Sequence, residues 1–87
     1  MRNFSVEQNL KKKLKIIFKK DKIMYKIVLK KFTEIIECKD INHYKNLRKP
    51  LQNFKRVHVK SSFVLIFKFV EEKVIFYDLD HHDNIHK

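Results

Sequence analysis

The stretch RVHVKSSFVLIFKFVEEKVIFYDL, residues 56–79, decides the fold that the sequence predicts. It contains nearly all of three strand-like runs, at 54–60, 63–70 and 73–79. The middle run is apolar on both faces except at Lys68, as is typical of a central strand. The breaks KSS and VEE are long enough only for hairpins, so the runs predict an antiparallel sheet. Because the chain has no glycine, we expect type I loops slightly longer than two residues, and not primed two-residue turns.

Two amphipathic helices are predicted upstream of these strands. Apolar residues recur at helical spacing from about Val6 to Lys19, and Ser5 with Gln8 fits a capping box. A second apolar stripe runs from Asp21, a typical capping residue, to about Cys38. The predicted class is α+β, with an N-terminal antiparallel helix hairpin packed on a small antiparallel β-sheet. The first residues, MRNF, can add an edge strand, and residues 41–53 form a connecting loop with one short helical turn.

Length and composition limit what the chain can be. Its 87 residues, 44% hydrophobic, predict one domain over residues 1–87 with a single core. The absence of glycine excludes the P-loop and the dinucleotide fingerprint. Cys38 is the single cysteine, so we expect a packing residue and no disulfide. The N-terminus has no signal-like apolar core and the run FVLIF is too short to span a bilayer, which predicts a cytoplasmic protein without a membrane segment.

The charge of the chain favours a polyanionic partner. Lysine and arginine number 21 against 10 acidic residues, a net charge of +11, which suits nucleic acid, an acidic protein segment or an anionic membrane surface. No acidic residue lies between Asp40 and Glu71. Arg56, His58 and Lys60 alternate there on one predicted strand face, and a solvated outer face explains that pattern as well as a binding face does.

The C-terminal stretch DLDHHDNIHK, residues 78–87, holds three of the five histidines. They can form a metal site, a mobile polar tail or the wall of an active site. His82 and His86 are four residues apart, but a zinc site needs three or four protein ligands and Cys38 lies in another element, so we predict no metal. The residues alone leave the other two interpretations open.

The order of helix hairpin, irregular loop, three strands and C-terminal histidines resembles the RelE/ParE superfamily of type II toxins, whose RelE and YafQ branches cleave messenger RNA. The stretch RVHVKSSFVLIFKFVEEKVIFYDLDHHD is similar to the YafQ-type pattern. On that pattern His58 matches the first catalytic histidine and His82 the second, with His81 as the alternative one position away.

The resemblance implies a metal-independent endoribonuclease without cofactor, acting on mRNA in association with the ribosome. His58 and His82 would share the base and acid roles at the ribose 2'-OH and the departing 5' oxygen, while Arg56 and Lys60 offset the charge on phosphorus. The implied RNA-binding residues are Arg48, Lys49, Lys55 and His86, with Tyr77 as a second candidate for base stacking. The implied protein partner is a RelB-like antitoxin with an acidic segment.

Two departures from the pattern favour an alternative function. The acid that precedes the aromatic residue of the second strand in YafQ-like toxins is Ser62 here, and the early arginine of RelE-like toxins is Val64 or Leu65. The alternative is a ParE-like toxin that is not a nuclease and inhibits a protein target such as DNA gyrase.

Overall fold

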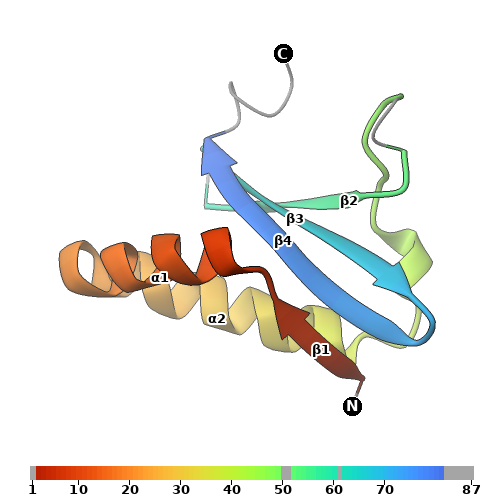
Figure 1. The fold of residues 1–87 in the computed structure, drawn as a ribbon, viewed down its shortest axis with the longest axis horizontal. Helices are drawn as coiled ribbons and strands as arrows, with labels where there is room; N and C mark the ends of the chain where they lie inside the picture. Colours follow the sequence, from red (N-terminus) through yellow and green to blue (C-terminus); the bar gives the residue numbers. More distant parts are fainter. Residues whose placement is uncertain (1, 50–51, 61, 82–87) are drawn as a thin grey trace.

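Two helices cover one face of a four-stranded sheet in the computed structural model, which describes residues 2–49, 52–60 and 62–81 (Figure 1). In chain order the elements are β1 (Asn3–Val6), α1 (Gln8–Lys20), α2 (Lys22–Glu37), a 3-10 turn (Ile41–His43), β2 (Lys55–Val59), β3 (Phe63–Val70) and β4 (Lys73–His81). The predicted α+β class, with its helix hairpin and three antiparallel strands, is confirmed.

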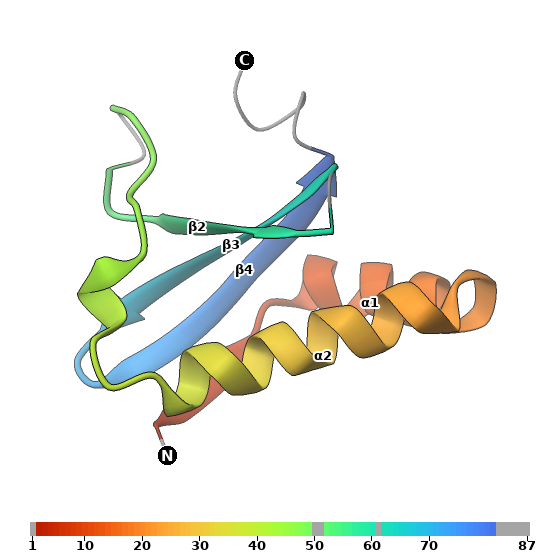
Figure 2. The same ribbon diagram turned by 180° about the vertical axis from the view of Figure 1, so that it is seen from behind.

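The sheet is mixed because β1 joins it as an edge strand beside β4 (Figure 1), while β2 lies at the other edge (Figure 2). The strand order is β1-β4-β3-β2, and β1 runs parallel to β4 with Phe4 opposite Val74. The edge strand expected from the first residues is therefore present, slightly later in the chain and parallel to its neighbour.

The two helix starts differ in how well the sequence predicted them. Ser5 lies in β1 and α1 begins only after Glu7, so the predicted Ser5–Gln8 capping box is wrong. The Glu7 N–H donates to the Phe76 carbonyl at 2.9 Å, which shows that pairing with β4 extends up to the helix and outweighs the local helical pattern. Asp21 does cap α2 as predicted, because its Oδ1 accepts a hydrogen bond from the Met24 N–H at 3.0 Å.

The hairpin turn between β3 and β4 contradicts the expected loop type. Val70 pairs with Lys73, so only Glu71 and Glu72 connect the strands, and their φ angles are +52° and +66°. Positive φ at both central residues is typical of a type I′ turn, which matches the twist of the paired strands. The strand register therefore imposes a left-handed backbone on two glutamates, although glycine or asparagine is the usual residue there.

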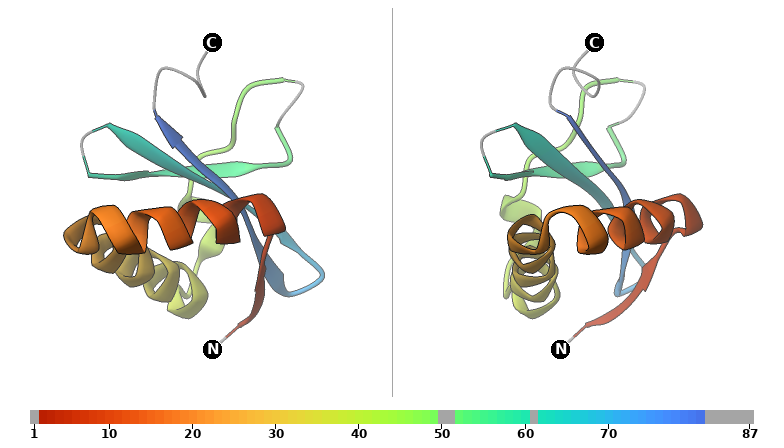
Figure 3. Two further views of the ribbon diagram at one scale, coloured as in Figure 1. Left: turned by 60° about the vertical axis from the view of Figure 1, so that its left-hand side comes forward. Right: turned by 90° about the vertical axis from the view of Figure 1, so that its left-hand side faces the viewer.

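The core lies between the helix hairpin and the sheet (Figure 3). Its fully buried side chains include Leu10 and Val28 from the helices and Phe67 from β3. The rings of Phe32 and Phe76 stack at its centre with centroids 3.9 Å apart. No helix among the described residues is both long enough and apolar enough to cross a bilayer.

Candidate active site and RNA-binding face

The face of the sheet opposite the helices, called the open face below, carries the first part of the candidate site. Strand β2 alternates as predicted, with Val57 and Val59 packed on the helix side and Arg56 and His58 on the open face. Lys60 does not continue this alternation. It lies in the turn after β2 with a φ of +57° and is exposed.

Two cross-strand rows connect these residues with carboxylates on β4. The strand register gives the rows Arg56–Ile66–Asp78 and His58–Val64–Asp80. Residues of one row share a face, and each row spans two strand spacings, or about 10 Å. The open face therefore carries basic groups on β2 and carboxylates on β4. Asp78 and Asp80 are not among the predicted site residues, although the alternation in YDLD is a signal for them.

Lys13 of α1 reaches these carboxylates along the edge of β4, beyond the point where the pairing with β1 ends at Phe76. Its Nζ lies 2.8 Å from Asp78 Oδ1 and 3.9 Å from Asp80 Oδ2, and it donates to the Leu79 carbonyl at 3.1 Å. The Asp78 carboxylate also accepts from the Leu79 N–H at 2.9 Å. These contacts hold the carboxylate of Asp78 in place and tie the end of β4 to α1.

The centre of the open face is apolar because the loop before β2 folds over it. Leu47 is 7% exposed and packs with Val64 and Ile66, and Phe54 covers their margin. The loop is held alongside the start of β2 by a hydrogen bond from the Leu47 N–H to the Phe54 carbonyl, 2.9 Å long. The expected polar outer face thus exists only around this cluster. Leu47 was missed because nothing in the irregular loop sequence indicated which residue would be buried.

The predicted RNA-binding cations divide into two groups. Arg48 and Lys49 are exposed on the loop. Lys55 is half-buried, and its Nζ donates to Asn46 Oδ1 at 3.0 Å and to the Tyr44 carbonyl at 3.5 Å. The main contribution of Lys55 in the structure is therefore to fasten the loop to β2.

An aromatic surface lies beside the apolar cluster. Tyr77 is 44% exposed, and its ring lies 4.8 Å from that of Phe54, while Lys68 Nζ lies 4.9 Å from the centroid of the Phe54 ring. The register between β3 and β4 skips Tyr77, since Ile66 pairs with Asp78 and the next pair uses Phe76. Such a bulge redirects a side chain, and here it accompanies the contact of Tyr77 with Phe54.

The C-terminal histidines are only partly described. His82 and His86 lie outside the described residues. His81 ends β4 opposite Phe63, with ring centroids 5.7 Å apart, and Phe63 packs on the helix-side core. The alternation of β4 therefore places His81 and His58 on opposite faces of the sheet. Among residues 2–49, 52–60 and 62–81 no cluster of three potential metal ligands occurs.

Comparison with known proteins identifies the class of this fold. A mutant of YafQ from Escherichia coli aligns with a TM-score of 0.78 at 16% identity, covering 100% of both chains. A chain of the E. coli DinJ-YafQ toxin-antitoxin complex aligns at 0.77 and 19% identity, covering 99% of this chain and 98% of that one. The YoeB-YefM complex from Staphylococcus aureus gives 0.77 at 13% identity, with 94% and 98% covered. The fold is therefore shared with YafQ and with a chain of each of these two complexes, one of which is a toxin-antitoxin complex.

Sequence relatives then give the family. The "Putative toxin RelE4" of Methanocaldococcus jannaschii is 48% identical over 89 residues, which cover 100% of this chain and 93% of the relative. An uncharacterized protein of Methanosarcina mazei is 40% identical over 83 residues, with 93% and 94% covered. No family model matches the chain. On the strength of the M. jannaschii relative, the chain belongs to the RelE family of toxins.

Proposed function

We propose that this chain, as one domain over residues 1–87, is the toxin of a type II toxin-antitoxin pair and cleaves messenger RNA in association with the ribosome. The observation that carries the proposal is the open face, where Arg56 and His58 lie side by side on β2 without helices over them. The exposed loop cations Arg48 and Lys49 adjoin that face and suit the phosphates of RNA.

The proposed mechanism uses side chains only. One histidine takes the proton of the ribose 2'-OH, the 2' oxygen attacks phosphorus, and the other histidine gives a proton to the departing 5' oxygen. The products are a 2',3'-cyclic phosphate and a 5'-OH end. His58 is one of the two histidines, and His82 is the better candidate for the second because His81 lies on the opposite face from His58.

Arg56 is the proposed partner of the phosphate. Val64, one of the two positions where RelE-like toxins carry an arginine, is completely buried between His58 and Asp80, and Leu65 is buried on the helix side. Arg56 on the neighbouring strand β2 can supply bidentate contact to the phosphate, and Lys60 in the turn after β2 adds a point charge. Tyr77 and His86 are the candidates for stacking on an unpaired base.

An antitoxin is the proposed protein partner. The solved DinJ-YafQ and YoeB-YefM complexes hold proteins of this fold with a second protein, the first of them as a toxin-antitoxin complex. With a net charge of +11, this chain would associate fastest with an acidic partner, and salt would weaken the complex.

The test is primer extension on messenger RNA after induction of the wild-type chain, His58→Ala and His81→Ala in a host without the antitoxin. We expect new cuts with wild type and His81→Ala, and at least about a hundredfold fewer with His58→Ala. Purified protein with ribosomes should give the same cuts. Cuts that survive His58→Ala would refute the assignment of His58 as a catalytic histidine, and growth arrest without cuts would favour the ParE-like alternative.

A further inference from the structure

The last residues of β4 have a strand on one side only. β1 pairs with β4 as far as Phe76, whereas β4 continues to His81, and among the described residues no other strand lies along that outer edge. The N–H and C=O groups at an open edge need other partners. This end of β4 lies level with the candidate site, because His58 and Asp80 both pair with Val64 in one cross-strand row.

Three side chains take the place of the missing strand, and we call Lys13, Asp78 and Asp80 the β4 clasp. The Leu79 N–H donates to Asp78 Oδ1 at 2.9 Å, and the His81 N–H donates to Asp80 Oδ1 at 2.7 Å. The Leu79 carbonyl accepts from Lys13 Nζ at 3.1 Å. Because the same Nζ lies 2.8 Å from Asp78 Oδ1 and 3.9 Å from Asp80 Oδ2, one ammonium group holds both carboxylates and the strand itself.

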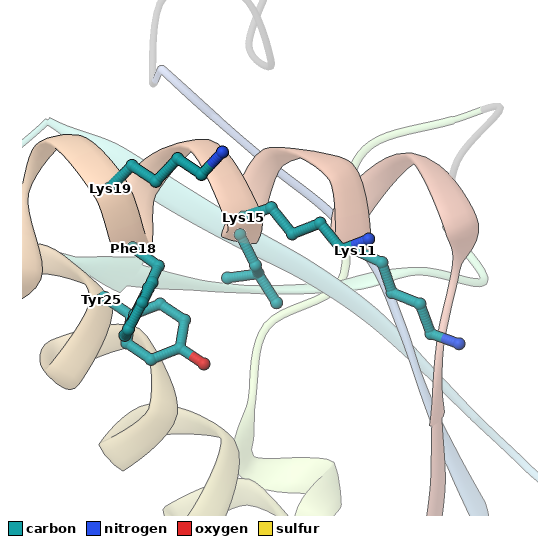
Figure 4. A pocket seen from close by; sticks show the side chains of 6 residues that line it. Lys11, Lys15, Phe18, Lys19 and Tyr25 are labelled. Atoms are coloured by element: carbon teal, nitrogen blue, oxygen red, sulfur yellow. The ribbon is translucent and has the colours of Figure 1, made fainter.

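Other lysines of α1 point in a different direction from Lys13. Lys11, Lys15 and Lys19 line a groove of about 410 Å³ between α1 and α2 (Figure 4). Since a helix has 3.6 residues per turn, Lys15 lies about 200° around α1 from Lys13. Lys15 is exposed and carries the same charge as Lys13 on the side of α1 away from β4. It is therefore a matched control for Lys13.

We propose that Lys13 is a positioning residue for the second histidine of the nuclease, an inference that rests on the proposed function. His82 follows His81 directly in the chain, so its distance from His58 depends on where β4 ends. The β4 clasp fixes that end by tying Leu79 to α1. An acid and a base that act on one phosphodiester must both stay within reach of it, and a misplacement of about 1 Å can cost about a hundredfold in rate. In this role Lys13 acts through β4 and does not touch the RNA.

Two substitutions of opposite charge separate positioning from general attraction for RNA. Lys13→Met removes a positive charge and Asp78→Ala removes a negative one, but each breaks the β4 clasp. If the clasp positions the site, both variants should lower kcat about tenfold and change KM less than about twofold. If charge alone mattered, KM would rise in Lys13→Met and fall in Asp78→Ala, because a cation favours RNA binding and a carboxylate opposes it.

The measurement is the rate of messenger RNA cleavage by the purified full-length chain with ribosomes. Lys15→Met, the same change on the groove side of α1, should leave kcat within about twofold of wild type. Lys13→Arg keeps a cationic donor and should recover most of the kcat that Lys13→Met loses. Hydrogen exchange at the Leu79 amide should accelerate about two- to fivefold in Lys13→Met and stay unchanged in Lys15→Met.

Three outcomes would overturn the role of Lys13. A normal kcat in Lys13→Met beside an active wild type would refute this role and leave the proposed function standing. Opposite shifts of KM in Lys13→Met and Asp78→Ala at constant kcat would leave only charge attraction. A lowered kcat with an unchanged Leu79 amide would mean that Lys13 acts on the RNA directly. A wild-type chain that makes no cuts would instead refute the proposed function, and the role of Lys13 in it as well.

Discussion

The two faces of the sheet are covered in different ways. On the helix side, residues from α1, α2, β2, β3 and β4 form one continuous core that includes the stacked Phe32 and Phe76 rings. On the open face a small cluster is closed by one loop residue, Leu47, over Val64 and Ile66. We infer that the helix side provides most of the stability. On the open face, Arg56 and His58 lie beside a small apolar cluster that only the loop before β2 covers.

The largest effect is expected for Phe76→Ala on the helix side. Phe76 is completely buried and contacts the rings of Phe4, Phe32 and Phe67, so its removal leaves a cavity and should lower the free energy of unfolding by about 3 to 5 kcal/mol. A chain of this size has roughly 4 to 13 kcal/mol in total. Urea unfolding followed by circular dichroism measures the loss. Val70→Ala, at a position 43% exposed, is the control and should change stability by less than about 0.5 kcal/mol.

A smaller loss is expected for Leu47→Ala on the open face. Leu47 is nearly buried, but its cluster has few members, so the free energy of unfolding should fall by about 2 to 3 kcal/mol. The exposed neighbour Arg48→Ala is the control. Hydrogen exchange at the Leu47 amide, which donates to the Phe54 carbonyl, should accelerate. If Leu47→Ala cost as much as Phe76→Ala, the two faces would be equally important for stability and the comparison would fail.

The helix-side face could be predicted from sequence because local patterns determine it. The apolar stripe of α2, the cap at Asp21 and the alternation at Val57 and Val59 all depend on neighbouring residues, and all are confirmed. The open face depends on contacts between distant segments. The burial of Leu47 and the reach of Lys13 to β4 depend on where the chain returns in space, which no local period encodes.

The predictions for the β3–β4 turn and for the start of the first helix are wrong for the same reason. Glu71 and Glu72 adopt positive φ because the pairing of β3 with β4 leaves only two residues for the connection. Ser5 joins a strand because β4 offers it hydrogen-bonding partners. In the candidate site, the strand residues Arg56 and His58 could be placed on a face in advance, whereas the position of Asp78 and Asp80 in the same cross-strand rows as Arg56 and His58 depends on the strand register.

A third prediction concerns the ion pair at the edge of the open face. Lys13 and Asp78 are 39% and 25% exposed, so solvent screens much of their attraction and a double-mutant cycle with Lys13→Met and Asp78→Asn should give a coupling of about 0.5 to 1 kcal/mol. The control cycle is Lys31 with Glu34, an i,i+3 pair on α2 whose side chains are 28% and 46% exposed, where about 0.3 kcal/mol is expected. Both couplings should shrink at high salt. A coupling at Lys13 no larger than the control would show that α1 does not hold the end of β4.

The smallest effect is expected at Tyr44, which joins the two regions because its ring packs edge-on against Phe67 of the helix-side core while it begins the loop over the open face. Burial, together with the nearby Cys38 and Glu34, raises the pKa of Tyr44 above its usual value of 10.0. The folded chain therefore keeps this proton at a pH where the unfolded chain releases it. The stability that this provides is complete below pH 10 and is lost as the pH rises through the folded-state pKa.

Tyr44→Phe should match wild type at pH 7 and lose less stability between about pH 9.5 and 11. Urea unfolding across that range measures the difference, and Tyr77→Phe at an exposed position is the control. Identical pH profiles for wild type and Tyr44→Phe would mean that the Tyr44 ring is buried no more deeply than an ordinary surface tyrosine. The loop would then not close against the core.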